Sequence, residues 1–233
     1  MTDKLISIVI PTYNEKENIS SLVSVLSKKL FKYNYEIIVI DDHSQDGTIE
    51  VLRKIEKNNK KVKLFLNHPP KGLAKSILLG WKKAKGELIV GMDADFNHDP
   101  NIINNLIQEI NDSDVVVASR FIKGGGMQNK FRYFSTYLFN MILRIIFAFP
   151  LTDNASGYYV IKKKLANKLP LEEIFQGYGE YHLRLVYLAN KNNFKIVEVP
   201  VYYQRRKYGQ SKSNLVKMLV SYLKTAWELR YKS

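Results

Sequence analysis

Short apolar runs alternate with segments of helical periodicity along the first half of the chain. Five runs predict buried strands, and these lie at residues 5–10, 36–40, 62–66, 87–90 and 115–118. Between them, apolar residues recur three or four positions apart, as at Ile19, Leu22 and Leu26, which predicts amphipathic helices. Because the strands are almost continuously apolar, both faces of the sheet should be covered. The alternation therefore indicates a mainly parallel, doubly wound α/β sheet.

The second half has a different pattern. Residues 123–126 contain three consecutive glycines and predict a flexible link. Residues 131–149 are apolar and aromatic, but Arg132, Asn140 and Arg144 interrupt them, which predicts a helix that does not span a membrane. This helix belongs either to the core or to a membrane interface. Further strands are predicted at residues 156–161 and 195–203, and further helices at residues 179–190 and 214–230.

Composition excludes several classes of protein. The 233 residues are 45% hydrophobic and 25% charged, as in an ordinary globular protein. Without cysteine the chain can form no disulfide, thiolate metal site or cysteine nucleophile, and its four histidines have no zinc-site spacing. The first residues show no basic segment followed by an apolar one, so we expect no signal peptide and a cytoplasmic protein.

The excess positive charge is confined to the second half. Residues 1–116 carry 16 Lys and Arg and 16 Asp and Glu, whereas residues 117–233 carry 20 and 6, so that half accounts for the net charge of +14. An anionic partner is therefore expected there: nucleic acid, an anionic membrane or a phosphorylated substrate. A solvated, lysine-rich surface is the simpler explanation of the short run at residues 162–164.

Polar segments follow the first, second and fourth predicted strands, at residues 11–15, 41–48 and 93–100. The carboxyl ends of parallel strands lie at one edge of a sheet, and ligands bind beyond that edge. We therefore expect these segments to converge on one site. Neither the G-x-G-x-x-G fingerprint nor a P-loop is present, which argues against a dehydrogenase and against a P-loop nucleotidase.

Asp93 and Asp95 are the strongest candidates for chemistry. They are two positions apart at the end of a predicted strand, so in an extended chain their side chains share one face. Two carboxylates suit Mg²⁺ or Mn²⁺, which bind through oxygen ligands and substrate phosphates. The alternative is an ordinary turn, in which Asp99 caps a helix that begins at Pro100.

Four motifs together resemble a known family. They are PTYNE at residues 11–15, DDHSQDGT at 41–48, DADFNHDP at 93–100 and SRF at 119–121. In this order they resemble the inverting glycosyltransferases of family 2, which implies a GT-A-type fold. Within the family the likeness is to the dolichol-phosphate mannose synthases, and it continues through residues 124–126, 132–135, 156–157, 198–200 and 206–212.

The resemblance implies a reaction and a set of site residues. A sugar, by this likeness mannose from GDP-mannose, is transferred to dolichyl or another polyprenyl phosphate with inversion at the anomeric carbon. The residues implied in nucleoside binding are Pro11, Tyr13, Glu15, Ile40 and Asp42. The diphosphate and metal would be held by Asp93, Ala94 and Asp95, with Asn97 as a third ligand where close relatives carry glutamine. The acceptor phosphate or leaving diphosphate would be surrounded by Arg120, Arg132, Ser135, Arg206 and Lys212, with Asp93, Asp95 and Arg120 as the catalytic residues.

Elementary chemistry is consistent with a phosphate acceptor. A phosphate monoester has a second pKa near 6, so it is mostly a dianion at pH 7 and needs no general base. A hydroxyl acceptor usually needs one. Glu180 and His182 stand where hydroxyl-acceptor relatives carry a Glu-Asp pair, and they are the alternative candidates for a base.

A polyprenyl phosphate also implies a location at a membrane. Residues 1–121 would form the nucleotide-sugar-binding half of a single domain, and residues 122–233 the acceptor-binding, membrane-facing half. The helices at residues 131–149 and 214–230 would lie on the cytoplasmic face of a membrane, alone or with an anchoring subunit.

Three alternatives remain open from the sequence. Guanine and uracil donors cannot be distinguished, so a uridine diphosphate hexose is a second candidate donor. A saccharide hydroxyl is a second candidate acceptor. The basic second half and 15 tyrosines also allow a nucleic-acid-binding protein, although no recognised binding module is present and the first half is neutral.

Overall fold

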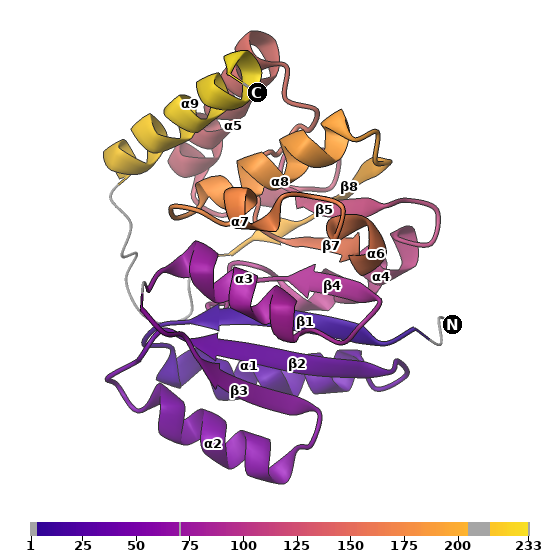
Figure 1. Ribbon diagram of the computed structural model, residues 1–233, viewed down its shortest axis with the longest axis vertical. Helices are drawn as coiled ribbons and strands as arrows, with labels where there is room; N and C mark the ends of the chain where they lie inside the picture. Colours follow the sequence, from indigo (N-terminus) through magenta and orange to yellow (C-terminus); the bar gives the residue numbers. More distant parts are fainter. Residues whose placement is uncertain (1–3, 70, 205–214, 233) are drawn as a thin grey trace.

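The computed structural model describes residues 4–69, 71–204 and 215–232, which form a central sheet covered by helices on both faces (Figure 1). The strands are β1 (Ile6–Thr12), β2 (Tyr35–Asp41), β3 (Val62–Leu66), β4 (Leu88–Gly91), β5 (Val115–Ser119), β6 (Gly126–Met127), β7 (Tyr159–Lys162), β8 (Ile196–Pro200) and β9 (Tyr202–Tyr203). The helices are α1 (Lys16–Lys29), α2 (Thr48–Asn58), α3 (Leu73–Lys83), α4 (Ile103–Glu109), α5 (Lys130–Phe147), α6 (Lys163–Ala166), α7 (Leu171–Ile174), α8 (Glu180–Lys191) and α9 (Leu215–Tyr231), and the 3₁₀ turn η1 (Pro100–Ile102) precedes α4.

The main sheet has the strand order β3-β2-β1-β4-β7-β5-β8. All neighbouring pairs are parallel except the two that involve β7, which confirms the predicted mainly parallel, doubly wound α/β fold. Tyr159 at the start of β7 pairs with Gly91 of β4 and with Val117 of β5. Because β7 is antiparallel, it begins at the edge where β4 and β5 end.

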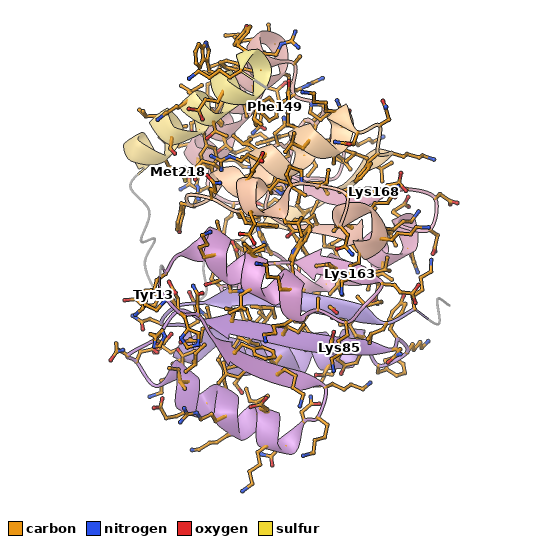
Figure 2. The ribbon with its side chains drawn as sticks, in the orientation of Figure 1. Tyr13, Lys85, Phe149, Lys163, Lys168 and Met218 are labelled. Atoms are coloured by element: carbon orange, nitrogen blue, oxygen red, sulfur yellow. The ribbon has the colours of Figure 1, made fainter. Side chains whose placement is uncertain are left out.

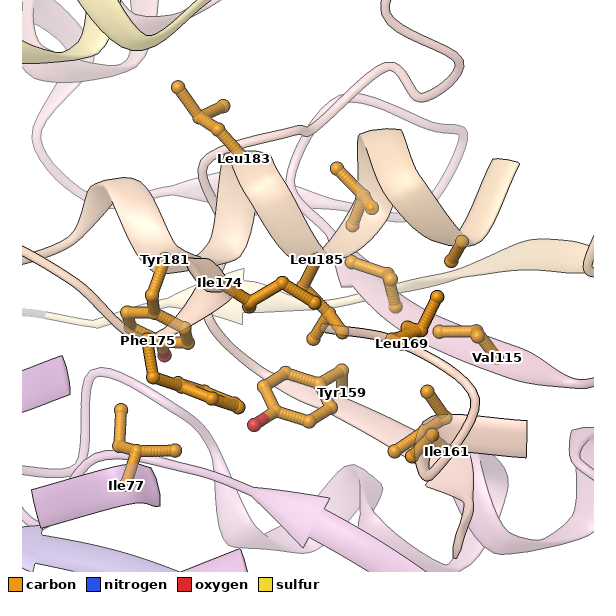
Figure 3. Packing of buried hydrophobic residues seen from close by; sticks show 14 of the residues in the cluster. Ile77, Val115, Tyr159, Ile161, Leu169, Ile174, Phe175, Tyr181, Leu183 and Leu185 are labelled. Carbon is orange, nitrogen blue, oxygen red and sulfur yellow. The ribbon is translucent and has the colours of Figure 1, made fainter. Parts of the chain in front are cut away.

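Alternate strand residues belong to two separate hydrophobic clusters, one on each face of the sheet. Ile8 and Val90 pack in the cluster that includes the apolar faces of α1 and α4. Val9 and Ile89 pack in the other, which includes α3 and α8. Figure 3 shows part of this second cluster, where Leu185 of α8 packs against β7. Burial on both faces explains why the strands lack the polar alternation of a half-exposed sheet.

The glycine run is a hydrogen-bonded turn, not the flexible link that the sequence predicted. The N–H of Gly125 donates to the carbonyl of Ile122, and the N–H of Gly126 donates to that of Val201 over 3.0 Å. A Cβ atom on Gly125 would lie 2.6 Å from the carbonyl oxygen of Ser119, so the close backbone approach requires glycine. The turn leads into β6, which pairs with β9 in a small parallel sheet.

Helices α5 and α9 lie side by side at one end of the molecule, next to α8 (Figure 1). The last helix has its predicted apolar stripe, but the stripe is divided: Tyr222 and Ala226 are buried, whereas Leu223 and Trp227 are exposed. Helix α5 is divided in the same way, since Phe139 is buried and other apolar side chains face outward. Within the described ranges, no helix combines the length and apolar character needed to cross a bilayer.

Candidate active site

The polar segments after β1, β2 and β4 lie at one edge of the sheet, as the strand order requires. Thr12 at the end of β1 pairs with Asp41 at the end of β2, and Gly91 at the end of β4 also pairs with β1. Tyr13 marks this edge in Figure 2, and Lys85, which precedes β4, marks the opposite edge. Strand β1 lies where the strand order reverses, which is where open α/β sheets bind ligands.

Two adjacent aspartates fix the loops beside β1. Asp41 is fully buried, and its carboxylate accepts hydrogen bonds from the backbone N–H and the hydroxyl of Ser44, both over 2.7 Å. The carboxylate of Asp42 accepts from Nδ2 of Asn67 and from the N–H of Gly72, both over 3.0 Å. Asp42 therefore joins the loops that follow β2 and β3 on the side where the nucleoside is expected.

The residues expected to bind the nucleoside differ in exposure. The ring of Tyr13 is 46% exposed, while Pro11, Glu15 and Asp42 are partly buried. The side chain of Ile40 is fully buried in the cluster beneath α3. The side chain of Ile40 therefore offers no exposed surface to a nucleoside and instead belongs to the hydrophobic core.

A cavity of about 370 Å³ opens next to the end of β4. Its wall brings together five residues of the predicted metal and phosphate sites, from segments far apart in the chain. They are Asp93, Asn97, Arg120, Arg132 and Ser135. Acidic and amide groups from the turn after β4 thus share one cavity with basic and hydroxyl groups from the second half.

The chain turns sharply after β4 and does not continue as an extended strand. Phe96 has a φ of 64°, in the left-handed region, and this allows the N–H of Asn97 to donate back to Oδ1 of Asp95 over 3.0 Å. Asp95 is buried and Asp93 is partly exposed, and both belong to this turn and not to an extended strand. The carboxylate of Asp99 caps the following turn, as predicted.

His98 is hydrogen-bonded to the backbone of Asp93. Its Nδ1 accepts a hydrogen bond from the backbone N–H of Asp93 over 2.9 Å, so the proton of the neutral ring is on Nε2. Nε2 lies 3.1 Å from the carbonyl oxygen of Ser156 and 3.6 Å from Oδ2 of Asp93. The ring stacks on Tyr158 with 5.0 Å between centroids. His98 therefore connects the acidic turn to the segment that enters β7.

The chemistry of the acidic turn fits a hard divalent cation. Asp93, Asp95 and Asn97 offer carboxylate and amide oxygens, which are the ligands of Mg²⁺ and Mn²⁺. The amide of Asn97 donates through Nδ2 to Oδ2 of Asp95 over 3.0 Å, which leaves Oδ1 as its potential ligand atom. The partly exposed carboxylate of Asp93 lines the cavity.

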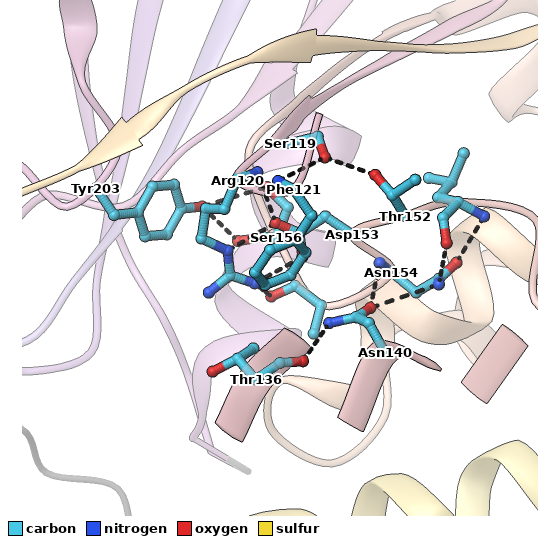
Figure 4. Close-up of polar contacts among 12 residues, drawn as sticks. Ser119, Arg120, Phe121, Thr136, Asn140, Thr152, Asp153, Asn154, Ser156 and Tyr203 are labelled. Atoms are coloured by element: carbon cyan, nitrogen blue, oxygen red, sulfur yellow. Dashed lines mark hydrogen bonds and ion pairs between the residues drawn. The ribbon is translucent and has the colours of Figure 1, made fainter. Parts of the chain in front are cut away.

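Arg120 is held rigidly by a buried ion pair, shown in Figure 4. Its Nε and Nη2 donate to the two carboxylate oxygens of Asp153, each over 2.6 Å, and both side chains are almost completely buried. Burial disfavours the charge, but the carboxylate of Asp153 more than compensates and raises the pKa of Arg120 above its usual value. The guanidinium also lies 4.8 Å from the ring centroid of Tyr203. A permanent positive charge is thus fixed in the cavity wall.

The loop that carries Asp153 is itself anchored to β8. The carboxylate of Glu198 accepts from the hydroxyl of Thr152 over 2.7 Å and from the backbone N–H of Asp153 over 3.0 Å. Oδ1 of Asn140, on α5, accepts from the N–H of Asn154 over 2.7 Å (Figure 4). The position of Arg120 therefore depends on β8 and α5 as well as on β5.

The remaining predicted phosphate-binding residues divide into two groups. Arg132 and Ser135 lie in the first two turns of α5, where Asn129 caps the helix by accepting from the N–H of Arg132. The hydroxyl of Ser135 donates to the carbonyl of Arg132 over 3.1 Å. Arg206 and Lys212 lie outside the described residues.

Neither candidate for a general base is suited to that role. The carboxylate of Glu180 accepts hydrogen bonds from the N–H of Tyr178 and from the hydroxyl of Ser221, so it joins the start of α8 to α9. His182 lines the cavity, but burial lowers its pKa to about 3, and the opposing effect of the Asp153 carboxylate does not offset this. A group with this pKa is a weak base at pH 7.

Replacing Asp153 with Asn is expected to destabilise the protein strongly. The substitution leaves Arg120 as an uncompensated buried charge, which costs about 3–5 kcal/mol. The free energy of unfolding in urea should fall by roughly this amount. Glu172→Gln is the matched control, because it breaks the exposed ion pair with Lys82 and should leave the urea midpoint unchanged. Equal effects of the two substitutions would contradict the structural role of the buried pair.

Replacing His98 with Phe is expected to weaken divalent-cation binding. The ring stacking on Tyr158 is preserved, but the hydrogen bonds to Asp93 and Ser156 are lost. Groups that orient a metal ligand typically contribute 10–100-fold to metal affinity. Calorimetric titration with Mn²⁺ and a nucleoside diphosphate should show a loss of this size. His68→Phe, at an exposed position, is the control, and an unchanged Kd in His98→Phe would exclude the orienting role.

Known proteins resemble the chain in sequence and in structure. Dolichol-phosphate mannosyltransferase of Pyrococcus furiosus is 33% identical over 229 residues, which cover 96% of this chain and 63% of that protein. The chain thus spans less than two thirds of this relative's length. The Saccharomyces cerevisiae protein of the same name is 30% identical over 96% of this chain and 86% of its own length.

Glucosyl-3-phosphoglycerate synthase of Mycobacterium tuberculosis, solved with Mn²⁺, uridine diphosphate and phosphoglyceric acid, superposes with a TM-score of 0.74. It is 18% identical and covers 98% of this chain and 79% of its own, which shows a common GT-A-type fold.

A sequence model of Glycosyl transferase family 2 matches residues 7–170. This range contains β1 except for its first residue, β2 to β7, the acidic turn after β4 and the buried pair of Arg120 with Asp153. The resemblance that the four motifs predicted is confirmed, and the chain belongs to glycosyltransferase family 2.

Proposed function

We propose that this protein transfers mannose from GDP-mannose to dolichyl or another polyprenyl phosphate, with inversion at the anomeric carbon. The observation that carries the proposal is the single cavity that Asp93 and Asn97 share with Arg120, Arg132 and Ser135. One wall suits a metal-bound diphosphate and another suits a phosphate nucleophile. The relatives named dolichol-phosphate mannosyltransferase support this choice of substrates.

The positive wall matches the needs of a phosphate acceptor. At pH 7 the acceptor is mostly a dianion, so its oxygen can attack without a general base. The buried ion pair prevents Arg120 from losing its charge or moving when the acceptor binds. Arg132 adds a second cation at the start of α5, where the helix N-terminus also favours an anion. These groups orient the nucleophile and offset the repulsion between the two phosphate groups.

Asp93, Asp95 and Asn97 would hold Mg²⁺ or Mn²⁺ against the donor diphosphate. The bound cation would neutralise the charge that develops on the leaving diphosphate. His98 orients Asp93 through its backbone N–H, and the buried Asp95 is oriented by Asn97. The turn therefore presents its oxygen atoms in a fixed arrangement before any substrate arrives. The M. tuberculosis neighbour, solved with Mn²⁺, supports a divalent cation.

Helices α5 and α9 would place the cavity at the surface of a membrane. Both contribute to its wall, through Arg132 and Ser135 of α5 and through Met218 and Tyr222 of α9. Their outward-facing apolar side chains are Phe131, Phe134, Tyr137, Leu138, Ile145, Ile146, Val220, Leu223, Trp227 and Tyr231. Exposed basic residues accompany them, and α5 contains no acidic residue. Apolar and basic groups together favour an anionic bilayer interface on the cytoplasmic side, with or without an anchoring subunit.

A uridine diphosphate hexose is the second candidate donor, because the M. tuberculosis neighbour was solved with uridine diphosphate. A saccharide hydroxyl acceptor is less well supported, since Glu180 is engaged in joining α8 to α9 and His182 is a weak base. Family membership argues against the nucleic-acid-binding alternative.

The wild-type protein is expected to move labelled mannose from GDP-mannose into polyprenyl phosphate. A chelator should abolish transfer and added Mg²⁺ or Mn²⁺ should restore it, with product configuration determined by NMR. Asp93→Asn should reduce kcat/KM at least 100-fold, because it removes a carboxylate from the predicted diphosphate and metal site. Asp114→Asn is the matched control and should be active. Asp114 directly precedes β5, and its carboxylate forms an ion pair with Lys162. Transfer from uridine diphosphate hexoses alone would favour the second donor, and no transfer from any donor would exclude the proposal.

Binding to vesicles that contain anionic lipid is expected to depend on α5. Phe131 and Ile145 are 82% and 76% exposed, and replacing both with Ser should weaken vesicle binding roughly 10–100-fold. Phe31, which is 69% exposed after α1, provides the control, since Phe31→Ser should bind like the wild type. Co-sedimentation with vesicles measures the difference. Equal losses in both variants, or no loss in either, would contradict the proposed orientation.

A further inference from the structure

His182 is a polar residue buried in the wall of the cavity. It lies in the first turn of α8, its side chain is 2% exposed, and it belongs to the cavity wall. Neither Nδ1 nor Nε2 has a hydrogen-bond partner among the residues that the structure describes. A buried polar atom without a partner costs free energy, so native proteins retain one where a ligand or an ordered water completes it.

Packing fixes the plane of the His182 ring. It stacks on the ring of Tyr159 with 5.6 Å between centroids and a 26° interplanar angle, and its edge meets the ring of Tyr181 at 6.2 Å. Because burial lowers its pKa to about 3, the imidazole is neutral at pH 7. A neutral imidazole offers one N–H donor and one nitrogen acceptor. The ring of His182 therefore carries one donor and one acceptor, on opposite edges, in a fixed plane.

His182 shares the cavity wall with both charged regions, because Asp93 of the acidic turn and Arg120 line the same cavity. In the proposed reaction the donor diphosphate lies at Asp93 and the acceptor phosphate lies near Arg120. The transferred sugar must lie between them, because the bond that breaks and the bond that forms share its anomeric carbon.

We infer that His182 hydrogen-bonds a hydroxyl group of the transferred sugar and so contributes to the choice of sugar. This inference rests on the proposed function and extends it to a specificity-determining residue. A sugar carries several hydroxyl groups, each of which can donate or accept, so hydroxyl groups can serve either ring nitrogen. A phosphate dianion only accepts and could serve only the N–H, and a polyprenyl chain serves neither nitrogen.

The inference is tested with nucleotide sugars that each lack one hydroxyl group. His182→Phe keeps an aromatic ring against Tyr159 and removes both polar atoms, whereas His182→Gln keeps one donor and one acceptor. In the wild type, removing the contacted hydroxyl should weaken binding of the nucleotide sugar about 10-fold or more. In His182→Phe the complete sugar should bind as weakly as the deoxy sugar binds to the wild type, and the same deletion should have no further effect. His182→Gln should bind the complete sugar more tightly than His182→Phe does.

Equilibrium binding separates this inference from the proposed function. Calorimetry compares the Kd of each nucleotide sugar with that of the nucleoside diphosphate alone, which should be unchanged in His182→Phe if the fold is intact. If every deoxy sugar loses the same factor in wild type and His182→Phe, His182 does not contact the sugar and the inference is wrong. If the diphosphate also binds more weakly to His182→Phe, the test rests on the wild type, in which an equal Kd for the complete sugar and for every deoxy sugar overturns the inference. Absence of transfer to polyprenyl phosphate by the wild type would instead overturn the proposed function.

Discussion

The direction of β7 is the constraint on which the rest of the site depends. Strand β5 ends at the carboxyl edge of the sheet, and β7, antiparallel to it, begins at the same edge. The connection between them, residues 120–158, therefore starts and finishes beside the acidic turn and contains α5. A parallel β7 would have required this connection to return to the opposite edge. One reversed strand thus assembles the basic and acidic walls of the cavity.

The basic wall illustrates how a buried charge becomes a fixed feature of a binding site. Taking a guanidinium out of water is costly unless a carboxylate with good geometry compensates it. Asp153 does so with two short hydrogen bonds, and its own backbone is tied to Glu198. In the proposed reaction Arg120 would therefore need no reorganisation to face a phosphate, and preorganised charge is more effective than charge that must first be ordered. The basic wall combines such a fixed group with the more accessible Arg132 of α5.

The sequence predicted most of the sheet because each strand is buried on both faces and reads as a continuous apolar run. It also predicted the edge at which the polar segments meet, which follows from parallel strands alone. The direction of a strand cannot be read from the residues of such a run, so the reversal of β7 could not be predicted.

The partners of Arg120 and Asp93 were missed for another reason. Asp153 is 33 positions away from Arg120 and joins it only through the tertiary fold, although its place in a short polar segment between apolar stretches was a usable signal. His98 was near Asp93 in sequence, but its contact with the segment before β7 was not foreseeable. Ile40 was carried over from the family motif, and only the packing beneath α3 showed that its side chain faces the core.

The close contact between α8 and α9 has a consequence for how the protein is made. A Cβ atom on Gly179 would lie 1.9 Å from the hydroxyl oxygen of Tyr222, so the two helices meet without an intervening side chain. Tyr222 and Met218 of α9 complete a cavity whose other walls come from much earlier in the chain. Helix α9 is the last of the described elements along the chain. During synthesis the cavity can therefore close only after α9 has left the ribosome.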